Sequence, residues 1–146
     1  MSEVFAQDLC TMEPFKDSMR WVITRKQTSA STVRVADGEL TITLETGELL
    51  ARVPTAGLRI VTPRRLRKME CGVVVELDGK PVAVMFDLIH SRQQFRAAQQ
   101  RGGDGAVIRQ MAKPAANTRG NMTAARPITA RFLTALLAGG AIDMTA

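Results

Sequence analysis

The sequence is poor in the residues on which most catalytic and metal sites depend. Its 146 residues include one histidine, two cysteines, one tryptophan and no tyrosine. A multi-histidine metal site, or a nucleophile activated by histidine, would depend on His90 alone. Cys10 and Cys71 stand apart, without the paired spacing of a zinc site or the density of a disulfide framework. We therefore expect a protein that is not an enzyme and that uses no metal or cofactor.

Long apolar runs and secretory features are also missing. No stretch approaches the roughly 18 apolar residues that a transmembrane helix needs. Glu3 and Asp8 fall where a signal peptide would have basic residues followed by an uninterrupted apolar stretch. The content of 45% apolar and 23% charged residues is that of a globular protein, and the length suits one core. These features predict a single cytoplasmic domain without a transmembrane segment.

What the sequence does contain is a period of two between Trp21 and Asp87, which is typical of β-strands. Asp37-Gly38 and Asp78-Gly79 are dipeptides that supply positive φ angles in two-residue hairpin turns. We count about seven short strands and expect an α+β fold with an antiparallel meander. The segment GVVVELDGKPVAVMFD is apolar on both faces, so we expect both faces to be covered. The predicted strands are WVITR, STVRVA, ELTITL, ELLARV, GLRIV, GVVVEL and PVAVMFD.

We expect helices on both sides of this region. Before it, apolar residues between Val4 and Met12 predict a short docking helix that ends at Pro14. After it, the pattern predicts a helix from Ser91 to Gly102, a second helical segment in AVIRQMAK, a connection in PAANTRGNMTAAR and a final helix from Pro127 to Ala138. The apolar face of the final helix either packs on the core of the same chain or binds a partner. That face consists of Ile128, Phe132 and Leu136.

Three stretches together resemble the pleckstrin-homology-like fold, including its bacterial PH and GRAM-type members. They are TVRVADGELTITLETGELLARVPTAGLRIV, GVVVELDGKPVAVMFD and SRQQFRAAQQ, and the resemblance covers about residues 20–101. It implies a bent, partly open barrel of two sheets with a helix at one end, which binds phosphoinositides, other acidic lipids or protein segments without catalysis. Residues 1–19 would then be a docking segment, 20–101 the core and 102–146 a basic helical extension. The ADGE and ETGE turns are acidic where such domains commonly carry basic lipid-binding loops.

Charge is distributed unevenly along the chain. Residues 1–60 hold seven basic and eight acidic side chains, whereas residues 61–146 hold thirteen basic and six acidic ones. Arginine predominates in the second half, and its planar guanidinium suits bidentate contacts with phosphate or carboxylate groups. We expect the first four of the candidate anion-binding residues in a turn or at a strand edge. The candidates are Arg64, Arg65, Arg67, Lys68, Arg92, Arg96 and Arg101.

The sequence therefore predicts a binding or assembly module with a basic surface for an acidic lipid or protein. One alternative is a nucleic-acid-binding protein that contacts the phosphate backbone, because Phe95 and Phe132 are the only aromatic residues between Leu88 and Ile142 that could stack on bases. Another is a structural subunit of a larger assembly, such as a phage or secretion particle. Partner proteins, self-association, an anionic phospholipid surface and nucleic acid all remain open as partners.

Overall fold

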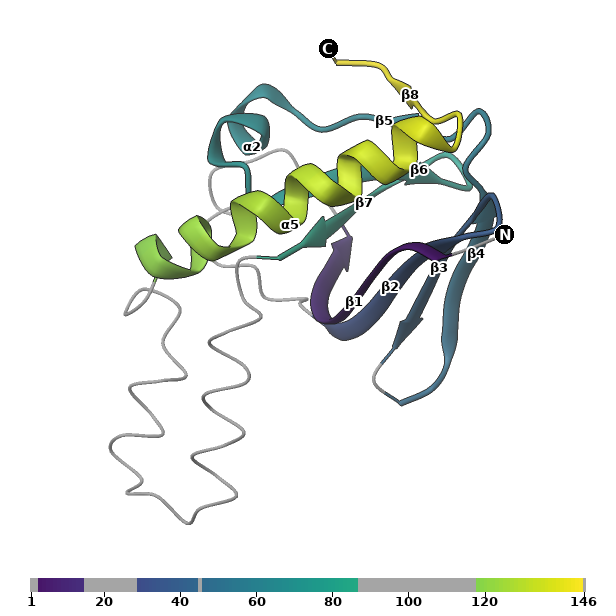
Figure 1. Cartoon of the computed structure of the whole chain (residues 1–146), viewed down its shortest axis with the longest axis horizontal. Coiled ribbons are helices and arrows are strands. Elements are labelled where there is room, and N and C mark those ends of the chain that lie inside the picture. The colour runs from purple at the N-terminus through teal and green to yellow at the C-terminus, as the bar shows by residue number, and fades with distance from the viewer. Residues whose placement is uncertain (1–2, 15–28, 45, 87–117, 146) are drawn as a thin grey trace.

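The structure is a computed structural model that describes residues 3–14, 29–44, 46–86 and 118–145. These residues form an α+β fold in which a bent sheet is packed against a C-terminal helix (Figure 1). The helices are α2 (Arg64–Met69) and α5 (Thr118–Ala138). The strands are β1 (Glu3–Pro14), β2 (Ser29–Ala36), β3 (Glu39–Leu44), β4 (Leu49–Pro54), β5 (Arg59–Ile60), β6 (Gly72–Leu77), β7 (Lys80–Met85) and β8 (Ile142–Asp143).

The first strand joins two halves of the sheet, whose strand order is β4-β3-β2-β1-β7-β6-β5-β8. β1 pairs with β2 from Glu3 to Met12 but with β7 only from Thr11 to Pro14. All neighbouring strands are antiparallel except β5 and β8, which are parallel. Among the described strands, no pairing joins β4 to β8, so the sheet is open.

The helix predicted between Val4 and Met12 is therefore wrong, because this segment is a strand at the centre of the sheet. The pairing of β1 with β2 shifts register between Gln7 and Cys10. Such an irregularity interrupts the alternation of buried side chains along a strand, and here it produces a spacing that imitates a helix. Within the predicted docking segment, residues 1–19, the stretch Glu3–Pro14 thus forms a strand of the sheet.

Both hairpins predicted from Asp-Gly dipeptides are confirmed. Asp37 and Gly38 have φ angles of 53° and 75°, and Asp78 and Gly79 have φ angles of 52° and 75°. Two consecutive positive φ angles are what a type I′ turn needs, and its twist matches that of the flanking strands. β2 thus pairs with β3, and β6 pairs with β7, in the registers that the two-residue turns impose.

The burial expected for the two hairpins is confirmed as well. The first hairpin has one buried face and one solvent-exposed face. The buried face carries Val33, Val35, Leu40 and Ile42, whereas Arg34 is exposed. In the second hairpin, consecutive residues are buried on both strands, which requires cover on both faces. These residues are Val73, Val74, Val75, Ala83, Val84, Met85 and Phe86.

Three phenylalanines connect the two halves of the sheet through α5. Phe132 of α5 lies 5.1 Å from Phe5 of β1 and 5.4 Å from Phe86, which follows β7, measured between ring centroids. Phe5 and Phe86 are 6.1 Å apart in an edge-to-face arrangement. Aromatic pairs at these separations attract beyond simple burial. In Figure 1, α5 runs between the β1–β4 strands and the part of the fold that holds α2, β5 and β8.

Helix α5 begins nine residues before the predicted start at Pro127, within the segment that we expected to be a connection. Proline removes one backbone donor but does not end a helix that packing holds on both sides. Ala125 precedes Pro127 and is fully buried, whereas Pro127 itself is exposed. The predicted end of the helix at Gly139-Gly140 is confirmed.

The residues after α5 bind the chain back to the second half of the sheet. Thr55 donates a hydrogen bond from Oγ1 to the Gly139 carbonyl at 2.9 Å, and a Cβ at residue 139 would overlap the Thr55 side chain. The backbone N–H groups of Ile142 and Met144 then donate to the carbonyls of Leu58 and Ile60 at 2.8 and 2.9 Å. The C-terminal residues are therefore an integral part of the sheet.

Three further predictions concern residues outside the described part of the chain. They are the strand at 21–25, the helix at 91–102 and the helical segment AVIRQMAK at 106–113.

Candidate functional site

The four basic residues at 64–68 lie on a short helix, where we had predicted a turn or strand edge. Pro63 supplies the N-cap with a φ of −69°, and its carbonyl accepts a hydrogen bond from the Arg67 N–H at 2.9 Å. Leu66 is 1% exposed and anchors the helix in the core. The helix has six residues and buries only one of them, so its sequence shows no repeat of apolar residues by which a helix could be recognised.

The structure divides the predicted anion-binding residues into different environments. Arg64, Arg65 and Lys68 are exposed on α2 and form no ion pair with any described residue. Arg67 is half-buried and is used within the fold. Arg92, Arg96 and Arg101 lie outside the described residues.

Arg67 links α2 to the C-terminal strand. Its Nη2 donates to Asp143 Oδ1 at 2.7 Å and to Thr145 Oγ1 at 2.6 Å. Its Nε is buried without a hydrogen-bond partner in the described structure. Burial opposes the charge of the Asp143 carboxyl, but the hydrogen bonds from Arg67 and Thr145 outweigh that effect, so the pKa of Asp143 lies below its ordinary value.

This link holds the C-terminal strand β8 beside the basic helix α2. Ile142 and Met144 flank Asp143, and their exposed fractions are 52% and 47%. We use the name α2–β8 rim for these two residues together with the exposed Arg64, Arg65 and Lys68 of α2. It combines fixed positive charge with solvent-exposed apolar side chains.

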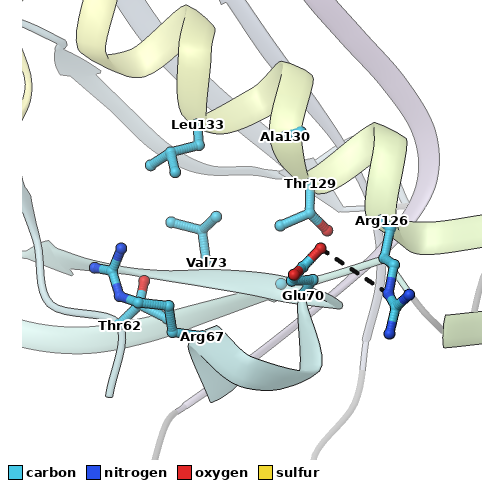
Figure 2. Close-up of a pocket in the computed structure, with 9 residues that line it drawn as sticks. Thr62, Arg67, Glu70, Val73, Arg126, Thr129, Ala130 and Leu133 are labelled. Atoms are coloured by element: carbon cyan, nitrogen blue, oxygen red, sulfur yellow. Dashed lines mark ion pairs between the residues drawn. The ribbon is translucent and has the colours of Figure 1, made fainter. Parts of the chain in front are cut away.

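A pocket of about 250 Å³ lies between α2, β6 and α5 (Figure 2). We call it the interhelical pocket. Val73 of β6 faces Leu133 of α5, and these two residues form its apolar wall together with Ala130, which also lines a second hollow. Ala130 and Leu133 recur at helical spacing, so they share the face of α5 that looks toward β6.

Two opposite charges point toward each other across the interhelical pocket. Figure 2 shows Glu70, at the end of α2, facing Arg126 of α5, with the Arg126 Nε 3.9 Å from the Glu70 Oε2. This separation exceeds hydrogen-bond length, and both side chains are more than half exposed, so the pair is weak. Glu70 has a φ of 53°, a left-handed conformation that is unfavourable for a residue with a side chain.

A second hollow of about 450 Å³ lies on the other side of α5, against β1. Its lining consists of small and apolar side chains with Arg131 as the single charged group. Among the residues that the structure describes, no three histidine, cysteine, aspartate or glutamate side chains gather closely enough to hold a metal ion. Neither described helix is long and apolar enough to cross a membrane.

The residues predicted to bind a partner on the final helix are instead used by this chain. Phe132 and Leu136 are fully buried, and Ile128 is half-buried against the same core. The two interpretations of this apolar face are thereby decided for Phe132 and Leu136, whose side chains are not accessible to a partner.

Sequence reasoning did not find the interhelical pocket. Glu70 and Arg126 are 56 positions apart, and no local pattern indicates that they face each other. The helical spacing of Arg126, Ala130 and Leu133 was the one indication in the sequence that these residues share a face. The same helix carries a second face that is more strongly apolar, and that face dominates the sequence pattern. Comparison with known protein families, characterised proteins and solved structures finds no match to this chain.

Proposed function

We propose that the chain is a cytoplasmic, non-enzymatic binding module of pleckstrin-homology-like type that docks on anionic phospholipid surfaces through the α2–β8 rim. The observation that carries this proposal is the junction of Arg67 with Asp143, at 2.7 Å. It holds the exposed basic residues of α2 beside a strand that exposes Ile142 and Met144.

Charge and apolar surface have different roles in such an interface. Basic side chains are attracted to anionic headgroups from a distance, at about 1 kcal/mol for each lysine or arginine near the surface. Apolar side chains then bury area at the boundary between headgroups and acyl chains. Nucleic acid would attract Arg64, Arg65 and Lys68 as strongly as a lipid surface does. Burial of Ile142 and Met144, however, would contribute little to its binding. The mixed composition therefore favours a lipid surface.

Cosedimentation of the full chain with vesicles tests this proposal. We expect binding to phosphatidylcholine vesicles that contain phosphatidylserine, weaker binding as salt is raised, and none to phosphatidylcholine alone. The combined variant Arg64→Gln/Arg65→Gln/Lys68→Gln should bind about 100-fold more weakly, because three surface charges are lost. Met144→Gln, which removes an exposed apolar side chain without changing the net charge, should also weaken binding.

A matched variant separates the rim from overall charge. Arg34→Gln/Arg52→Gln/Lys80→Gln removes three exposed basic residues of β2, β4 and β7 that are not part of the rim, and it should retain most of the binding. Equal losses in both triple variants would show that net charge alone drives the association. Tighter binding to duplex DNA than to anionic vesicles at equal ionic strength would instead support the nucleic-acid alternative.

A further inference from the structure

We infer that the interhelical pocket binds a small zwitterion, an aliphatic α-amino acid or a compound of the same chemistry. The carboxylate of such a ligand would pair with Arg126, its ammonium group with Glu70 and its apolar part with Val73, Ala130 and Leu133. This site is separate from the α2–β8 rim, and the inference does not rest on lipid binding.

The size of the pocket sets the class of ligand. Its volume of about 250 Å³ exceeds the roughly 150 Å³ cavity that is known to hold benzene, but it is smaller than the range of about 300–1,000 Å³ that is usual for small-molecule sites. A molecule with a polar head and a short aliphatic chain therefore fits, whereas a nucleotide or a folded peptide does not.

The charges of the pocket set the ligand's charge pattern. Arg67 also lines the pocket, but its Nη2 is already bonded to Asp143 and Thr145. Arg67 keeps a buried Nε without a partner in the described structure, and its charge is balanced by Asp143. Arg126 and Glu70 are the lining charges that have no hydrogen-bonded partner among the described residues, because they meet only at 3.9 Å. A simple anion would be attracted by Arg126 and repelled by Glu70, and a simple cation would experience the reverse. A zwitterion satisfies both groups.

The local backbone supports the same assignment. The left-handed φ of 53° at Glu70 ends α2, and its N–H donates to the Leu66 carbonyl at 3.2 Å. A glycine would adopt this conformation at lower cost. Glutamate at this position instead directs a carboxylate toward Arg126, as Figure 2 shows. Strained positions of this kind concentrate at binding sites.

Three probes with related carbon chains test the charge pattern. Norvaline carries both charged groups, pentanoate lacks the ammonium group, and butylamine lacks the carboxylate. We expect saturable binding of norvaline to the full chain, with a dissociation constant on the order of 1 mM or tighter. Pentanoate and butylamine should each bind roughly fivefold or more weakly, because each leaves one charge of the pocket without a partner. Amide chemical shifts of Gly72, Val73 and Ala130 report the site.

Two variants connect each charge to its partner. In Arg126→Gln the advantage of norvaline over butylamine should disappear, and in Glu70→Gln its advantage over pentanoate should disappear. Arg131→Gln removes a charge of the same helix that lines the second hollow, and it should leave all three affinities unchanged. Circular dichroism of each variant checks that the fold is retained.

Two results would overturn the inference. One is the absence of saturable binding of glycine, alanine, norvaline and leucine up to roughly 50 mM, which is far above the affinity expected for a built site. The other is binding of pentanoate or butylamine as tight as that of norvaline. Neither result bears on vesicle binding, which is tested with variants of Arg64, Arg65 and Lys68.

Discussion

The two halves of the bent sheet are held together in different ways. The half formed by β1 to β4 is a meander in which each strand pairs with the next along the chain. In the half formed by β7, β6, β5 and β8, the edge strand is β8, which lies near the C-terminus. An ion pair between Arg67 and Asp143 holds that strand to α2. Local pairing therefore builds one half, and contacts between distant segments complete the other. Both the rim and the interhelical pocket belong to the half that depends on distant contacts.

One ion pair from each half shows the same difference. Arg52 and Glu39 pair across β4 and β3 at 3.1 Å, with 63% and 38% of their side chains exposed. Arg67 and Asp143 pair at 2.7 Å, with 35% and 12% exposed. The chemistry is the same, but solvent weakens the first pair far more than the second. The two pairs therefore test how much each half depends on its charges.

The largest effect should come from breaking the contact that both halves share. Phe132→Ala removes the ring of α5 that packs on both Phe5 and Phe86, and it leaves a cavity in the core. We expect the free energy of unfolding to fall by about 3–5 kcal/mol. Chemical denaturation measures this change, and Leu137→Ala, at a residue 43% exposed, is the control. A similar small loss in both variants would contradict the proposed role of α5 as the joint between the halves.

An intermediate effect should follow from Asp143→Asn in the second half. The neutral amide cannot form the ion pair with Arg67, and we expect a loss of about 1–2 kcal/mol at neutral pH. Because the pKa of Asp143 is lowered in the folded state, its stabilisation is present above the unfolded pKa of about 3.9 and is lost as the pH falls through the lower folded value.

The wild-type chain should therefore lose more stability than Asp143→Asn when the pH is lowered from about 5 to about 2. Denaturant titrations at several pH values measure this difference. Parallel pH profiles for the two proteins would show that the Asp143 carboxylate does not stabilise the fold.

The smallest effect should come from Glu39→Gln in the first half. A hydrogen bond from Arg52 lowers the pKa of Glu39, but both side chains are in contact with solvent. The change in stability should therefore be smaller than that of Asp143→Asn and should diminish further as salt is added. Thermal unfolding at low and high ionic strength measures it. A loss equal to that of Asp143→Asn would remove the distinction between the two ion pairs.

Prediction from sequence succeeded where short-range chemistry decides the structure. Asp37-Gly38 and Asp78-Gly79 determined two turns, and alternation around Arg34 determined the dry face of the first hairpin. It failed for β1, where a register shift between Gln7 and Cys10 obscures the alternation. It also failed at Pro127, where burial of Ala125 keeps the helix continuous across a residue that usually begins one.

By itself, the sequence determined the hairpins, the buried faces of their strands, the end of α5 and the excess of basic residues in the second half. Each of these depends on residues within a few positions of one another. Only the tertiary structure decided that the N-terminal segment is the central strand, that Phe132 and Leu136 are covered by this chain, and that Glu70 faces Arg126. These outcomes require contacts between segments separated by tens of residues, and such contacts are selected by the packing of the whole core, which no local pattern records.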